Sequence, residues 1–164
     1  MNAMKTLIPA LACALLAMPA VAADRGVNEV SGSLSYNDIE DVTLTTLAVS
    51  YGRYLTPMHE LGLTASYLEL EAFDESLDGT ELGAFYHLNF DNGSTMVPYV
   101  GVNVATIGGD LGDAYDFAYG LSAGLKLYPY EHVGVQISVA YQKLQAAEDY
   151  WDDVDGTSVN VGLS

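Results

Sequence analysis

The amino-acid sequence predicts an all-β protein: an eight-stranded antiparallel up-and-down transmembrane β-barrel that follows a cleaved N-terminal signal peptide. Three observations lead to this prediction. Segments in which bulky apolar residues alternate with small or polar ones recur about eight times. Residues 1–23 have the organisation of a secretory signal. No apolar run after them is long enough for a membrane-spanning helix.

The signal peptide is predicted to span residues 1–23, which leaves residues 24–164 as one barrel domain. Lys5 supplies the positive first part, residues 7–18 form a short apolar run, and residues 20–22 are a small-x-small cleavage sequence. The apolar run is shorter than the roughly 20 residues that a spanning helix needs. The segment is therefore interpreted as a removable signal and not as an anchor.

The composition of the predicted mature chain argues against cysteine chemistry and against nucleic-acid binding. Cys13, the only cysteine, lies inside the signal, so the mature chain has neither disulfides nor thiol chemistry. Removal of Lys5 with the signal leaves four basic residues against 22 acidic ones, a net charge of −18. Because nucleic-acid binding requires a basic surface, no nucleic-acid partner is expected.

Eight segments fit the strand template, in the order of a series of hairpins. Their ranges are 27–36, 42–55, 60–70, 80–90, 96–107, 115–128, 133–143 and 156–164. Several of them have the roughly 9–11 residues that a tilted membrane strand requires.

The predicted connections are of two kinds. Those at 56–59, 91–95 and 129–132 are short and rich in turn-forming residues, whereas those at 71–79, 108–114 and 144–156 are longer and acidic. The connection at 37–41 is the one short member of the second set. Short periplasmic turns opposite longer outer loops are typical of bacterial outer-membrane barrels, so the acidic set is predicted to face outward from the cell.

The alternation gives the strands two different faces. The bulky set includes Phe117, Tyr119, Leu121, Ala123, Leu125 and Leu127; Leu61, Leu63, Ala65 and Tyr67; Leu82, Ala84, Tyr86, Leu88 and Phe90; Val100, Val102 and Val104; Val133, Val135, Ile137, Val139 and Tyr141; and Val159, Val161 and Leu163. The opposite set is rich in Gly, Ser, Ala and Thr. It would make a poor soluble surface for a lipocalin-like barrel but suits the narrow interior of a membrane barrel. The bulky set is therefore predicted to face lipid.

Aromatic residues cluster near both ends of the predicted strands. Those near the short-turn ends are Tyr51, Tyr54, Phe90, Tyr99, Tyr128 and Tyr130, and those near the long-loop ends are Tyr36, Tyr67, Phe117, Tyr119 and Tyr141. Aromatic rings at the two interfaces are typical of membrane barrels. These residues are predicted to form two girdles.

Three runs resemble a known family. Residues 98–102 (Pro-Tyr-Val-Gly-Val), 119–125 (Tyr-Gly-Leu-Ser-Ala-Gly-Leu) and 51–57 (Tyr-Gly-Arg-Tyr-Leu-Thr-Pro) are similar to the small outer-membrane β-barrel proteins, the OmpA/OmpX-like "porin family". The resemblance covers the predicted mature chain. It implies the barrel architecture and a location in the outer membrane of a Gram-negative bacterium, but no activity. Members of the family usually end in an aromatic residue, whereas this chain ends in Gly-Leu-Ser at residues 162–164.

Five polar residues are predicted to form a network in the lumen. Glu29, Glu60 and Lys126 have inward parity close to the short-turn ends, and His87 and Gln136 lie at a nearby height. A buried Lys126 must be paired, because an isolated buried charge is costly. A proton-titrating gate or a small active site is the functional alternative to this structural network.

The last acidic loop contains the candidate metal ligands Asp149, Asp152, Asp153 and Asp155. Carboxylates clustered in a loop can hold Ca²⁺ or Mg²⁺. However, Trp151 occupies the position where the first ligand of a calcium loop is expected. Solvated, mutually repelling carboxylates are therefore the favoured interpretation, and no cofactor is expected.

The sequence predicts a non-enzymatic protein. Barrel deacylases carry His and Ser two residues apart on a lipid-facing strand, whereas here Asn89 lies two residues after His87. The expected role is structural, or a surface interaction through the acidic outer loops. The expected partners are outer-membrane lipid and lipopolysaccharide, bridged by divalent cations. A narrow porin-like channel for small solutes and a lipid A-modifying enzyme are the alternatives.

Overall fold

The computed structural model describes residues 28–39, 42–72, 75–90, 94–130, 133–147 and 153–164. The predicted signal peptide and its boundary with the barrel domain lie outside these ranges.

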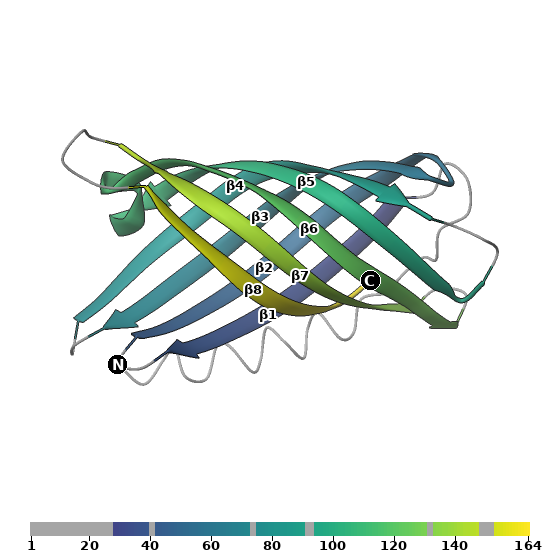
Figure 1. Cartoon of the computed structure of the whole chain (residues 1–164), viewed down its shortest axis with the longest axis horizontal. Coiled ribbons are helices and arrows are strands. Elements are labelled where there is room, and N and C mark those ends of the chain that lie inside the picture. The colour runs from purple at the N-terminus through teal and green to yellow at the C-terminus, as the bar shows by residue number, and fades with distance from the viewer. Residues whose placement is uncertain (1–27, 40–41, 73–74, 91–93, 131–132, 148–152) are drawn as a thin grey trace.

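The described chain forms eight strands and one short helical turn. The strands are β1 (Asn28–Ile39), β2 (Val42–Thr56), β3 (His59–Ala72), β4 (Glu75–Asn89), β5 (Met96–Gly109), β6 (Tyr115–Tyr130), β7 (Val133–Ala146) and β8 (Val154–Leu163), and the 3₁₀ turn is η1 (Asp110–Asp113). Each strand pairs antiparallel with the next, and β8 pairs with β1, so the sheet closes into a barrel of tilted strands (Figure 1). The predicted eight-stranded up-and-down barrel is thus confirmed. Within the described residues, no helix is long and apolar enough to cross a membrane.

The two ends of the barrel are defined by their connections. We call the end where β2 meets β3 the turn end, and the end that carries η1 the η1 end (Figure 1). The η1 end corresponds to the predicted outer face. Gly109 precedes η1 with a φ of 81°, a left-handed conformation that favours glycine.

The closure between β1 and β8 is the shortest pairing in the barrel. Residues 32–34 of β1 pair with residues 161–163 of β8, whereas β1 and β2 pair from Asn28↔Arg53 through Ile39↔Val42. Beyond this seam the two strands diverge towards the η1 end (Figure 1). Closing a sheet removes its unpaired edges. The β1–β8 seam therefore has the least backbone pairing of any junction between the described strands.

The prediction of a long loop at residues 71–79 is wrong. The pairing of β3 with β4 continues through Glu71↔Ser76 to Ala72↔Glu75, so most of this segment is strand. The physical reason is that the strands continue beyond the apolar band. In water, charged residues are tolerated on the outward face of a strand, so an acidic stretch need not be a loop.

The other two predicted long loops exist but are shorter. β5 runs to Gly109 and is followed directly by η1, which packs Leu111 against Gly79 of β4. β7 runs to Ala146, and β8 begins at Val154. Strand pairing thus extends further towards the η1 end than the turn-forming residues indicate.

Bulky apolar side chains cover the outside of the barrel, as predicted. Leu63 and Leu82 are 62% and 67% exposed, and Leu121 is exposed to a similar extent. Residues of the opposite parity, such as Gly62 and Gly120, are buried. This is the arrangement of a membrane barrel, in which the apolar face contacts lipid.

Three tyrosines that were predicted to belong to a girdle lie inside the barrel instead. Tyr54 and Tyr99 are only 4% and 2% exposed, and the Tyr128 hydroxyl donates a hydrogen bond to Glu29 in the lumen. Each shares its parity with the inward-facing residues of its strand. Parity therefore determines where these side chains point, and closeness to a strand end does not.

Glycines make room for the large side chains that fill the lumen. A Cβ atom at Gly62 would overlap the Phe85 ring and the carbonyl oxygen of Tyr51. A Cβ atom at Gly52 would overlap the carboxylate of Glu60. Protein interiors are packed closely enough that even one added methyl group is felt. Glycine is therefore needed at positions 52 and 62, because Glu60 and Phe85 occupy the space that a larger side chain would fill.

Replacing Gly62 with alanine should destabilise the barrel by about 1–3 kcal/mol, because the new methyl group meets backbone that cannot move aside. Gly156→Ala is the matched control, since nothing lies within 4 Å of a Cβ atom there. Urea titration of the protein in lipid vesicles, followed by the gel mobility of unheated samples, gives the two unfolding midpoints. Equal midpoints would contradict the packing described here.

Candidate functional site in the barrel lumen

Inward positions near the turn end carry the ionisable side chains of the lumen. Glu29 of β1 lies opposite Gly52 of β2, and Glu60 of β3 lies opposite Tyr54. Strand alternation turns each of these carboxylates inward, and the pairing register places them at a common height. Lys126 reaches the same region from β6.

Lys126 is completely buried at the centre of this group. Its Nζ donates hydrogen bonds to Glu29 Oε1 at 2.9 Å, to Glu60 Oε2 at 2.8 Å and to the Tyr54 hydroxyl at 2.9 Å. These acceptors come from β1, β3 and β2, none of which pairs with β6. An ammonium group has three donors, and all three are satisfied. The lysine therefore ties together strands that have no backbone contact.

Two tyrosine hydroxyls complete the surroundings of Glu29. Tyr54 and Tyr128 donate to Glu29 Oε2 at 2.9 and 3.0 Å. Their hydroxyl oxygens lie 3.3 Å apart. We refer to Glu29, Tyr54, Glu60, Lys126 and Tyr128 as the lysine cluster. Such a buried group of charges is stable only when each member is paired.

His87 and Asn89 lie beside Glu60. His87 Nδ1 is 3.1 Å from Glu60 Oε2, and Asn89 Nδ2 donates to the same oxygen at 3.5 Å. The His87 ring lies 4.5 Å, centroid to centroid, from the rings of both Phe85 and Tyr99. His87 is thus held by contacts on several sides within the lumen.

Gln136 lies outside the lysine cluster. Its Nε2 donates to the Tyr99 hydroxyl at 2.5 Å. Of the five residues predicted for the lumen, the structure brings Glu29, Glu60, His87 and Lys126 into one network and places Gln136 next to it, through Tyr99. Tyr54, Asn89, Tyr99 and Tyr128 were not predicted to take part, although their parity places all four inside.

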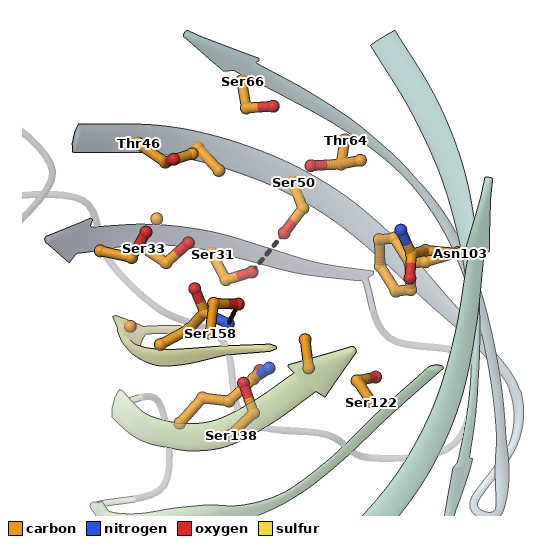
Figure 2. Close-up of a pocket in the computed structure, with 18 of the residues that line it drawn as sticks. Ser31, Ser33, Thr46, Ser50, Thr64, Ser66, Asn103, Ser122, Ser138 and Ser158 are labelled. Carbon is orange, nitrogen blue, oxygen red and sulfur yellow. Dashed lines mark hydrogen bonds between the residues drawn. The ribbon is translucent and has the colours of Figure 1, made fainter. Parts of the chain in front are cut away.

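A polar cavity of about 260 Å³ adjoins the lysine cluster. Glu29 and Glu60 line it, but Lys126 does not. Much of the remaining wall consists of hydroxyl and amide side chains: Ser31, Ser33, Ser35, Thr46, Ser50, Thr64, Ser66, Asn103, Ser122, Ser138, Ser158 and Asn160 (Figure 2). The lumen therefore has an ion-paired, filled part and an adjoining polar cavity.

Glu81 of β4 is a further carboxylate in the wall of this cavity. Ser66 Oγ donates to it at 3.0 Å, and Gln142 Nε2 donates at 2.9 Å. No ion pair links Glu81 to a cation of the described residues. Glu81 was not predicted as a site residue, although it has the same parity as Gly83 and Phe85.

The structure describes two of the four candidate metal ligands, Asp153 and Asp155. Asp149 and Asp152 lie outside the described residues. Asp155 of β8 lies opposite Lys143 of β7 in the strand pairing. Among the residues that the structure describes, no group of three or more His, Cys, Asp or Glu side chains could hold a metal ion.

Asp153, the fourth candidate, has a lysine partner. Lys143 Nζ lies 2.8 Å from Asp153 Oδ2, and the Ala146 amide donates to Asp153 Oδ1 at 3.2 Å. The hydrogen bond from Lys143, followed by that from the amide, holds the pKa of the Asp153 carboxyl below its usual value. This carboxylate therefore takes part in an exposed ion pair at the η1 end.

Replacing Lys126 with methionine should destabilise the barrel by about 3–5 kcal/mol, because two buried carboxylates lose their counter-charge. Lys143→Met is the control and should change the urea midpoint little, since its ion pair is exposed. Adding Glu29→Gln and Glu60→Gln to Lys126→Met should restore much of the loss, because no uncompensated buried charge then remains. A midpoint for Lys126→Met equal to that of Lys143→Met would contradict the role of the cluster.

Two solved barrels are similar to this chain. Neisserial surface protein A (NspA) aligns with a TM-score of 0.61 at 13% identity, covering 83% of this chain and 93% of its own. The N-terminal β-barrel domain of Pseudomonas aeruginosa OprF aligns with a TM-score of 0.59 at 18% identity, covering 85% and 96%. No similar sequence was found among curated proteins. At these identities the two structures support the fold alone.

The sequence itself matches the family described as "Outer membrane protein beta-barrel domain" over residues 8–164. This match covers nearly the whole chain and agrees with the closed barrel and its apolar exterior. The chain therefore belongs to the outer membrane protein β-barrel domain family, and its barrel lies in the bacterial outer membrane.

Proposed function

We propose that the protein is a non-enzymatic outer-membrane anchor whose barrel does not conduct and whose acidic outer end interacts with lipopolysaccharide. One observation carries the first part of this proposal. Lys126 and Glu60 are fully buried and hydrogen-bonded to each other across the lumen, and Asn89 beside them is fully buried too. A filled lumen is also what the small diameter of an eight-stranded barrel favours.

A narrow channel for small solutes is the second candidate. The polar cavity favours it, because hydroxyl and amide side chains suit an aqueous path. However, the cavity adjoins Glu29 and Glu60, whose carboxylates are bound by Lys126. A solute passing the lysine cluster would have to separate these charges inside a low-dielectric wall, which is costly.

The position of His87 supports a non-enzymatic role. Its ring is enclosed by Phe85 and Tyr99, and its Nδ1 faces Glu60 inside the lumen. A histidine that modifies lipid A must reach the lipid, whereas this side chain is on the opposite side of the barrel wall. His87 is therefore better suited to supporting the lysine cluster than to lipid chemistry.

Two carboxylates mark the outer limit of the apolar band. Glu69 of β3 is paired directly with Asp78 of β4, and both have the parity of the outward-facing Leu63 and Leu82. Like charges opposite each other on one face of a sheet repel. A divalent cation would relieve this repulsion and could simultaneously bind a phosphate group. This geometry supports cation-bridged contact with lipopolysaccharide.

Wild-type protein in planar lipid bilayers should give no reproducible conductance steps, because the lysine cluster closes the lumen at its turn end. A conducting porin added to the same bilayer is the control for the recording. Different gel mobilities of heated and unheated samples would show that the protein is folded. Steps that recur and increase in frequency with the amount of folded protein would favour the channel.

Lipopolysaccharide binding should require a divalent cation and should fall when Glu69→Gln and Asp78→Asn are combined. The matched control is Glu69→Asp with Asp78→Glu, which keeps both carboxylates and should retain binding. Titration calorimetry in detergent, with Mg²⁺ or with EDTA, measures the effect. Binding that is the same with EDTA, or the same in both double variants, would exclude this contact.

A further inference from the structure

Glu81 is a carboxylate in the cavity wall that no cation of the described residues neutralises. Ser66 and Gln142 hold it in place with one hydrogen bond each, at 3.0 and 2.9 Å. Because these donors are neutral, they fix the orientation of the carboxylate without cancelling its charge. The other lumen carboxylates differ, since both Glu29 and Glu60 are paired with Lys126.

The electrostatic character of the cavity follows from which charged groups line it. Glu29, Glu60, Glu81 and His87 are lining residues, but His87 Nδ1 lies against Glu60, and the Lys126 ammonium is completely buried behind the cavity wall. A narrow cavity with low-dielectric walls and one sign of charge concentrates its field and attracts counter-ions. The cavity therefore favours a cation over a neutral or anionic solute.

The rest of the wall offers neutral hydrogen-bonding groups. Ser33, Asn103 and Ser122 line the cavity (Figure 2), and none of them has a hydrogen-bond partner among the side chains that the structure describes. A hydroxyl can donate or accept, and an amide side chain can do both. Such groups match a solute that carries several hydroxyls.

An organic cation fits this cavity better than a metal ion does. A hard divalent cation takes six or more oxygen ligands, and a site made of side chains alone, with no phosphate to supply some of them, usually contains several carboxylates. No three acidic or histidine side chains of the described residues are gathered closely enough to provide them. One fixed carboxylate surrounded by hydroxyl and amide groups instead matches an ammonium group on a polyhydroxylated body. The volume of about 260 Å³ limits the ligand to a small molecule.

We propose that the lumen cavity is a binding site for a small hydroxylated organic cation, with its ammonium group against Glu81 and its hydroxyls against Ser33, Asn103 and Ser122. Because the lysine cluster closes the turn end, the ligand enters from the η1 end and leaves the same way. The barrel then acts as a binding cup and not as a pore. This proposal stands independently of the contact with lipopolysaccharide.

Glucosamine and glucose are a suitable pair of probes, because they have the same ring and differ by one ammonium group in place of a hydroxyl. Titration calorimetry on the folded full-length protein in detergent, at a pH where the amine is protonated and carboxylates are ionised, should show saturable binding of glucosamine with one site. Glucose should bind at least about tenfold more weakly than glucosamine, since a hydrogen bond to a charged group typically contributes more than a neutral one. Equal affinities, or no saturable binding of glucosamine, would overturn the proposal.

Two variants locate the site. Glu81→Gln keeps the shape of the side chain and one acceptor oxygen for Gln142, while the Ser66 hydroxyl can accept from the new amide group. It removes the charge, and should weaken glucosamine binding about tenfold. Asp155→Asn removes an exposed carboxylate of β8 that does not line the cavity, and should leave the affinity unchanged. Equal loss in both variants would assign the binding to general surface charge. If Glu81→Gln does not fold, Asn103→Ala, which alters the cavity wall without changing any charge, should still weaken glucosamine binding, and an affinity equal to that of Asp155→Asn would overturn the proposal.

Discussion

The buried ammonium of Lys126 constrains the rest of the lumen. A charge with no access to water must be met by opposite charge and by hydrogen-bond acceptors, and the barrel supplies them from three strands that do not pair with β6. The register of β1 against β2, and of β2 against β3, must then place Glu29, Tyr54 and Glu60 at one height. A slip of one residue would turn these side chains to the lipid face.

The barrel consequently has three regions with different kinds of side chains. The exterior carries the apolar side chains that lipid requires, the turn end of the lumen is filled by the lysine cluster, and the remaining lumen is a polar cavity beside it. Glu69 and Asp78, where the apolar face ends, belong to the outer surface, whereas Glu81 belongs to the cavity. Asp78 and Glu81 lie only three residues apart on β4 but point to opposite sides of the barrel wall, because successive side chains of a strand alternate between its faces.

Period-two alternation predicted the strands and their faces from the sequence, because it follows directly from strand geometry. It also placed Glu29, Glu60, His87 and Lys126 inside. It would have placed Tyr54, Tyr99 and Tyr128 there too, but their closeness to strand ends suggested a girdle. Their partners depend on the register across the lumen, which no single strand reveals. The acidic residues at 71–79 suggest a loop, but charged side chains do not by themselves end a strand, and the pairing of β3 with β4 continues there.

The burial of Lys126 in a closed lumen is tested most directly by the exchange of lysine ammonium protons with water. Beyond the predicted signal, the chain has only Lys126 and Lys143, so selective ¹⁵N-lysine labelling gives two side-chain NMR signals in detergent micelles. We expect the Lys126 ammonium to exchange slowly and to show contacts to the Tyr54 ring, whose centroid lies 5.2 Å from Nζ, while Lys143 exchanges fast. Equally fast exchange at both lysines would mean that water reaches the centre of the cluster, and would contradict a closed lumen.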